Sequence, residues 1–153
     1  MPLPGENLSK KDLRLIQQFV ESPTYFVEVM WGLKPQEKGK PFHLDKHITW
    51  QQAEMLAAVE AAIKGDRGGI KKSRKISIAS GRRVGKSAVL SWLVIWYLFC
   101  HPDSQIGCTA PDARQLFDVL WKEVAKWLRA MPHPWNRLFE WTQTYVRVKE
   151  RSE

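Results

Sequence analysis

The stretch Lys75-Ile-Ser-Ile-Ala-Ser-Gly-Arg-Arg-Val-Gly-Lys-Ser87 decides how the chain is interpreted. It starts with a short isoleucine-containing run, passes through a glycine-containing loop and ends on Gly-Lys-Ser. A Walker A phosphate-binding loop has Gly, four free positions and then Gly-Lys-Ser/Thr, between a strand and a helix. Ser80 stands where that pattern has its first glycine, and Gly81 supplies a flexible backbone one residue later. The stretch therefore predicts a strand over 75–80, a phosphate-binding loop and then a buried helix to about Cys100.

The residues of this loop suit the chemistry of a bound triphosphate. Glycines let backbone N–H groups approach phosphate oxygens, and the following helix places its positive N-terminal end on the same anion. Lys86 would put a charge on the β- and γ-phosphates, and the Ser87 hydroxyl would ligate Mg²⁺. The predicted nucleotide-binding residues of the loop are Gly81, Arg83, Val84, Gly85, Lys86 and Ser87. The alternative is a chance Gly-Lys-Ser in an unrelated loop.

Two arginines lie inside the loop, at positions 82 and 83. A cation beside the γ-phosphate stabilises the charge that develops there, as an arginine finger does. We therefore predict that Arg82 and Lys86 are catalytic residues. Of the two arginines, Arg82 is favoured over Arg83 for this role. The other interpretation is that both guanidinium groups are solvated or pair with an acidic neighbour.

The rest of the chain alternates in a way that indicates an α/β fold. Helices are predicted first, one of them started by Ser22-Pro23 and another opened by a Thr49–Gln52 capping box. After the loop and its helix, a second strand is expected over 105–109, an amphipathic helix over 112–130 and a strand over 141–149. The prediction is an incomplete parallel sheet of the P-loop NTPase type with an N-terminal helical lead-in. The lead-in is assigned to residues 1–48, and the first part of the ATPase domain to 49–153.

Composition limits the classes of partner. The 153 residues carry a net charge of +8, which favours nucleic acid, although a basic protein without such a partner fits the charge equally well. No apolar run reaches the roughly 20 residues needed to cross a membrane, and the N-terminus has no signal-peptide pattern. Cys100 and Cys108 form no disulfide framework. These features predict a cytoplasmic protein.

Two weaker signals remain open. His43 and His47 are four residues apart, but without a third ligand a packing or surface role is favoured over metal binding. The basic, glycine-rich stretch 64–75 would either contact DNA phosphates or serve as a solvated connection.

Three blocks of the sequence resemble a known family. The stretch Ile78-Ala-Ser-Gly-Arg-Arg-Val-Gly-Lys-Ser-Ala-Val-Leu90 is similar to the deviant Walker A loop of the large terminase subunits of tailed bacteriophages. Cys108-Thr-Ala-Pro-Asp-Ala-Arg-Gln115 resembles that family's Thr-Ala-Pro block, and Trp50-Gln51 resembles its adenine-recognising glutamine motif. The blocks occur in the family's order and rough spacing, from about Pro23 to the last residue.

The resemblance implies a motor that uses ATP and Mg²⁺ to package double-stranded DNA into capsids inside the bacterial host cell. Gln51 would hold the adenine, since an amide donates and accepts at once. The segment 109–115 would couple nucleotide state to DNA movement. By resemblance the partners are DNA, the small terminase subunit and the portal protein, and the full-length motor would form a ring.

One departure from the family changes what this chain is expected to do. The sequence has no apolar run ending in Asp-Glu, the Walker B element that helps hold the metal and activates water. The family's nuclease domain is absent as well. We therefore expect the first part of a motor domain, alone inactive in hydrolysis, whose strands at 75–80 and 105–109 lack partners. The alternatives are a non-catalytic prophage remnant or basic interaction module, and a helicase-like P-loop ATPase.

Overall fold

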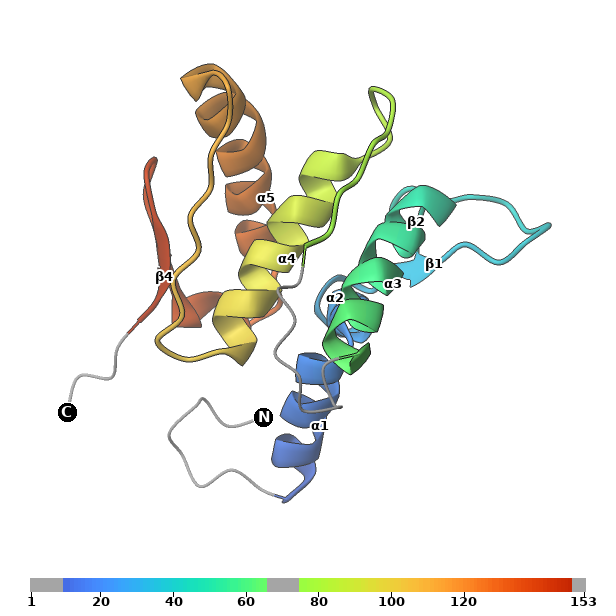
Figure 1. The fold of residues 1–153 in the computed structure, drawn as a ribbon. Coiled ribbons are helices and arrows are strands. Elements are labelled where there is room, and N and C mark those ends of the chain that lie inside the picture. Colours follow the sequence, from blue (N-terminus) through green and yellow to red (C-terminus); the bar gives the residue numbers. More distant parts are fainter. Residues whose placement is uncertain (1–9, 66–74, 150–153) are drawn as a thin grey trace.

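A computed structural model describes residues 10–65 and 75–149 and shows a mixed architecture of helices with two small sheets (Figure 1). The predicted basic stretch 64–75 falls mostly outside the described residues. The helices are α1 (Lys10–Glu21), α2 (Pro23–Trp31), α3 (Trp50–Lys64), α4 (Lys86–Cys100), η2 (Gln115–Trp121), α5 (Lys122–Ala130) and η3 (Trp135–Leu138). The strands are β1 (Lys34–Pro35), β2 (His47–Ile48), β3 (Phe139–Trp141) and β4 (Val146–Val148).

Helices α2 and α3 begin where local capping chemistry directs, and α2 also ends there. Ser22 caps α2 by accepting a hydrogen bond from the Tyr25 N–H at 3.1 Å, and proline opens the helix. Gly32, at φ 69°, ends α2 in the left-handed region. The predicted Thr49–Gln52 capping box is present at the start of α3.

Helix α4 lies at the centre of the molecule, with α5 and the β3–β4 hairpin on one side and α1, α2 and α3 on the other (Figure 1). Its apolar surface packs into two clusters of buried side chains. The larger cluster has at its centre Phe19, Phe26, Met30, Ile95, Trp96, Val124, Leu128 and Phe139. The smaller one contains Val27, Leu33, Ile48, Met55, Leu56, Val89 and Trp92, with Val84 packed against it. Residues from before and after position 48 thus share the same core.

The two sheets are small, and neither is the predicted sheet of parallel strands. β1 pairs with β2 in parallel, within the N-terminal region, and β3 pairs with β4 in antiparallel fashion. The C-terminal stretch expected as one strand over 141–149 instead spans the last residue of β3, a turn and β4, because the chain turns at Thr142–Thr144, where Tyr145 donates its N–H to the Thr142 hydroxyl.

The two other predicted strands, at 75–80 and 105–109, have no strand structure. A strand exists only through hydrogen bonds to a neighbouring strand, and neither stretch has one in the described part of the chain. Their apolar side chains are consequently exposed, by 42% for Ile76, 40% for Ile78 and 36% for Ile106. Both stretches run past α4 as plain traces in Figure 1. A parallel P-loop sheet is therefore not formed by the described residues.

The predicted amphipathic helix at 112–130 is present but begins as a π-helix. Residues Gln115–Trp121 form η2, and α5 continues directly from it. Val124 and Leu128 are its buried residues, on the face that packs against α4. Among the described helices, none combines the length and the apolar character needed to span a bilayer.

Candidate phosphate-binding site

The predicted loop is a turn that leads directly into α4. Gly85 adopts φ 81° at the N-cap position, in the left-handed region that glycine enters without steric cost. Arg83 also has a positive φ of 64°, which is uncommon for a residue with a side chain. Two left-handed residues within three positions curl the backbone back toward the start of the helix.

The Lys86 ammonium group bonds across the loop to its first residues. Its Nζ donates hydrogen bonds to the carbonyl oxygens of Ser80 at 3.0 Å and Gly81 at 2.7 Å. The side chain thereby reaches back across the loop from the first turn of α4. Ser80, which replaces the glycine of the strict pattern, contributes a backbone carbonyl, an atom that any residue would supply.

The start of α4 is open to an anion. Its N-cap residue is Gly85, so no side chain caps the helix, and the N–H groups of the first turn point out of the helix end. Lys86 and Ser87 lie in that first turn and are half-buried. The first turn of α4 thus combines the positive end of the helix with a residue that carries an ammonium group and one that carries a hydroxyl, a set of groups that fits a phosphate.

The two loop arginines are on the surface. Arg82 and Arg83 are exposed, and neither has an ion-pair partner among the described residues. Val84, between them and Gly85, is half-buried and packs against the smaller core cluster. The loop is therefore held by Val84 on its inner side, while both guanidinium groups remain available on its outer side.

The glutamine that contacts the loop is the neighbour of the predicted one. Gln51 lies half-buried in the first turn of α3 and makes no hydrogen bond through its side chain in the described part of the chain. Gln52 is only 9% exposed, and its Nε2 donates to the Gly85 carbonyl oxygen at 3.4 Å. The sequence signalled Gln52 only as a capping-box residue, because a contact across 33 positions leaves no local pattern.

The segment expected to couple nucleotide to DNA lies apart from this contact. In 109–115, the backbone turns at Asp112, whose carboxylate accepts from the Arg114 N–H at 2.9 Å, and Gln115 starts η2. No hydrogen bond joins the segment to the loop within the described residues. The preceding Cys108 lines a small cavity of about 290 Å³ together with β4.

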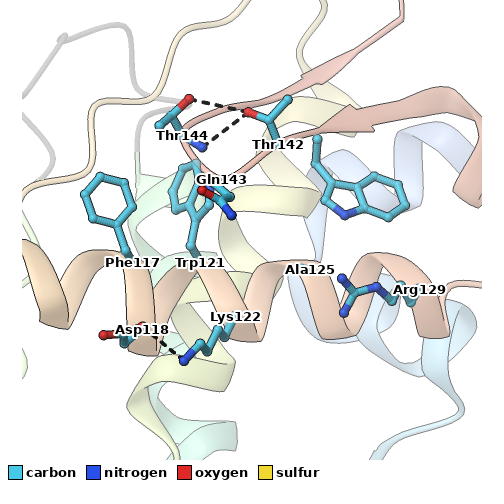
Figure 2. A pocket seen from close by; sticks show the side chains of 10 residues that line it. Phe117, Asp118, Trp121, Lys122, Ala125, Arg129, Thr142, Gln143 and Thr144 are labelled. Atoms are coloured by element: carbon cyan, nitrogen blue, oxygen red, sulfur yellow. Dashed lines mark hydrogen bonds and ion pairs between the residues drawn. The ribbon is translucent and has the colours of Figure 1, made fainter.

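A larger cavity of about 690 Å³ lies between the η2–α5 helix and the β3–β4 hairpin. Figure 2 shows the rings of Phe117 and Trp121 rising from the helix toward the hairpin, with Gln143 facing them. On the helix below, Lys122 pairs with Asp118 at 3.0 Å. None of the residues that line this cavity belongs to the loop.

Metal-ligating groups do not converge in the described ranges 10–65 and 75–149, where no cluster of three His, Cys, Asp or Glu side chains could hold an ion. His43 and His47 contact one another instead: the His47 Nδ1 accepts from the His43 N–H at 3.0 Å. Ser87 thus remains the residue predicted to contact Mg²⁺.

Comparisons with known proteins give no relative from which a role could be transferred. No family model matches the chain, and neither a curated protein nor a solved structure does.

Proposed function

We propose that the chain binds a nucleoside triphosphate, with ATP and Mg²⁺ as the pair, through the loop 81–87 at the start of α4. One observation carries the proposal: the Lys86 ammonium group lies against the carbonyls of Ser80 and Gly81, beside a helix N-terminus without a side-chain cap. A phosphate oxygen is a stronger partner for an ammonium group than a neutral carbonyl, because both partners are then charged. Lys86 would exchange the loop carbonyls for the β- and γ-phosphates.

The other loop residues have separate roles in this proposal. The N–H groups of the first turn of α4 bind phosphate oxygens, and the Ser87 hydroxyl ligates the metal. Arg82, which is exposed, would offset charge at the terminal phosphate, with Arg83 as the second choice. Gln51, in the first turn of α3, would read the adenine edge.

The wider function we propose is that of a DNA-packaging ATPase related to large terminase subunits, of which this chain supplies the nucleotide-binding part. Double-stranded DNA, a small terminase subunit and a portal protein would then be its partners, in a ring-shaped motor in the bacterial cytoplasm. The support is the order of the three sequence blocks and the net charge of +8. There are two rival proposals. A helicase-like ATPase would bind a nucleotide through the same loop, whereas a non-catalytic basic interaction module would bind no nucleotide there.

Calorimetry with Mg-ATP tests the proposal. Lys86→Ala should weaken binding by at least about tenfold, since it removes a charge-assisted contact worth roughly 1.5–3 kcal/mol. Lys40→Ala is the matched control, because Lys40 is exposed and its ammonium group forms a surface ion pair with Glu37, outside the loop. Equal ATP affinity in Lys86→Ala and the parent chain would refute the assignment and leave the basic interaction module as the better explanation.

A further inference from the structure

The Gly85 carbonyl oxygen accepts two hydrogen bonds from different parts of the chain. One is the helical bond from the Val89 N–H, at 3.2 Å, and the other is a longer bond from the Gln52 Nε2, at 3.4 Å. We propose that Gln52 is a positioning residue of the phosphate-binding loop, which holds the first peptide of α4 in its anion-binding orientation. The inference rests on the proposed nucleotide-binding function of the loop.

The geometry of the peptide bond gives this contact its consequence. A trans peptide is planar, and its C=O and N–H point in opposite directions. When the Gly85 carbonyl is held along the helix by Val89 and Gln52, the N–H of Lys86 must point out of the helix end. That N–H is one of the donors that a phosphate at this site would use. Gln52 thus acts on the anion site through the backbone and touches no ligand itself.

The Gln52 side chain is fixed before it reaches the loop. The side-chain Oε1 accepts from the Thr49 N–H at 2.9 Å, while the backbone N–H of Gln52 donates to the Thr49 hydroxyl at 3.2 Å. Because the amide oxygen is used by Thr49, the NH₂ group is the end that faces Gly85. With an exposed fraction of 9%, the side chain has little room for another rotamer. Gln52 therefore both completes the capping box of α3 and donates a hydrogen bond to the loop.

Gly85 and Gln52 fit one another closely. A Cβ atom on residue 85 would collide with the Gln52 Nε2 and lie 3.0 Å from its Cδ. The smaller core cluster continues the contact beneath them, since Met55 and Leu56 of α3 pack there with Val89 of α4. The loop is therefore in direct contact with the first turn of α3, which also carries Gln51.

Three variants separate the support of the loop from the capping of the helix. Gln52→Glu keeps an oxygen for the Thr49 N–H, as in the Ser/Thr-x-x-Glu box, but cannot donate to Gly85. Gln52→Met is uncharged and of similar length, and loses both contacts. Thr49→Ala removes the capping hydroxyl but leaves the Gln52 amide in place, so it is the control for loss of the cap.

The experiment combines Mg-ATP calorimetry, thermal melting and the amide NMR signals of Gly85 and Lys86 in the full chain without ligand. Both Gln52 variants should weaken ATP binding about three- to tenfold, the range expected for one uncharged hydrogen bond. Both should also shift the two amide signals. Thr49→Ala should lower the melting temperature about as much as Gln52→Met and leave ATP affinity and both signals nearly unchanged.

The outcomes distinguish this inference from the proposed function. If the parent chain binds ATP in a Lys86-dependent way and Gln52→Met binds equally well, Gln52 is only a capping residue and the inference is wrong. If Thr49→Ala weakens binding as much as the Gln52 variants, general loss of the cap explains the effect, and the inference is again wrong. If the parent chain binds no ATP, the proposed function fails, and the ligand-free amide signals still decide whether Gln52 orients the peptide.

Discussion

The indole N–H of Trp96, in α4, donates to the backbone carbonyl oxygen of Phe19, in α1, at 2.6 Å. In a continuous helix that carbonyl would accept from the N–H four residues later, but residue 23 is a proline and has none. Both side chains are buried, so an unpaired carbonyl here would be costly. Trp96 supplies the missing donor and ties the N-terminal helices to the helix that begins at the phosphate-binding loop.

Replacement of this tryptophan should therefore destabilise the fold. Trp96→Phe keeps most of the apolar area but leaves the Phe19 carbonyl without a partner, at an expected loss of about 1–3 kcal/mol in the free energy of unfolding. Trp92→Phe is the matched control on the same helix, since the buried Trp92 Nε1 has no hydrogen-bond partner within the described residues. Urea denaturation should show a clearly smaller loss for Trp92→Phe. Equal losses would mean that ring packing, and not the hydrogen bond, makes Trp96 important.

The helices were predictable because their signals are local. The Ser22-Pro23 start and the Thr49–Gln52 capping box lie within one helical turn of the positions they determine, and the structure confirms both. The strands at 75–80 and 105–109 were predicted from residue type, yet pairing depends on a neighbour that local sequence cannot specify. The C-terminal hairpin was missed for a related reason, because its turn at Thr142–Thr144 contains neither glycine nor proline.

The candidate site likewise has a part that local sequence predicts and a part that depends on tertiary packing. The loop, its open helix end and the reach of Lys86 follow from consecutive residues, and the structure places them as one unit. The contact between Gln52 and Gly85 could not be found from spacing, because it depends on how α3 packs against α4. Whether Gln51 or either loop arginine contacts a nucleotide stays a prediction.

The fit between Gly85 and Gln52 gives a prediction about stability. Gly85→Ala introduces a Cβ at φ 81° and pushes it against the Gln52 amide, so we expect a loss of at least about 1–2 kcal/mol. Gly107→Ala is the control, because that position has open space around it and no positive φ, and it should be neutral or slightly stabilising. Thermal melting of the two variants checks this. A Gly85→Ala chain as stable as the parent would show that residue 85 does not need the left-handed conformation.

The buried thiol of Cys100 leads to a prediction of how the free energy of unfolding changes at alkaline pH. Burial raises the pKa of the Cys100 thiol to about 12, from an ordinary value of 9.0. The thiol is then protonated in the folded chain while it ionises in the unfolded chain, so its contribution to stability is constant below pH 9 and falls between pH 9 and 12. The slope from this group approaches about 1.4 kcal/mol per pH unit.

The measurement is a comparison of the parent chain with Cys100→Ala by urea denaturation from pH 8 to 11. The variant is expected to be less stable at pH 8, because it leaves a small cavity, but to lose less stability as the pH rises. Cys108→Ala should differ less from the parent, since burial raises the pKa of that half-buried thiol as well but without a large shift. Parallel pH profiles for parent and Cys100→Ala would contradict the buried, protonated thiol.

The last prediction is that the chain binds ATP but turns it over at a negligible rate. Hydrolysis needs a carboxylate that orients the attacking water, and the sequence has no apolar strand ending in Asp-Glu. Asp103 lies in a turn at φ 59°, and the Asp112 carboxylate accepts from the Arg114 N–H, so neither extends a strand toward the loop.

The exposed isoleucines of the unpaired stretches should also make the purified chain prone to self-association.

A phosphate-release assay at saturating Mg-ATP, with Lys86→Ala as the background, measures the rate, and light scattering measures the association. Replacement of Ile76 and Ile78 by threonine should reduce the scattering without change in ATP affinity, because threonine keeps β-branching and removes apolar surface at exposed positions. Steady turnover that disappears in Lys86→Ala would contradict the prediction. It would mean that a carboxylate present in this chain orients the water, and Asp103 and Asp112 would be the first to substitute.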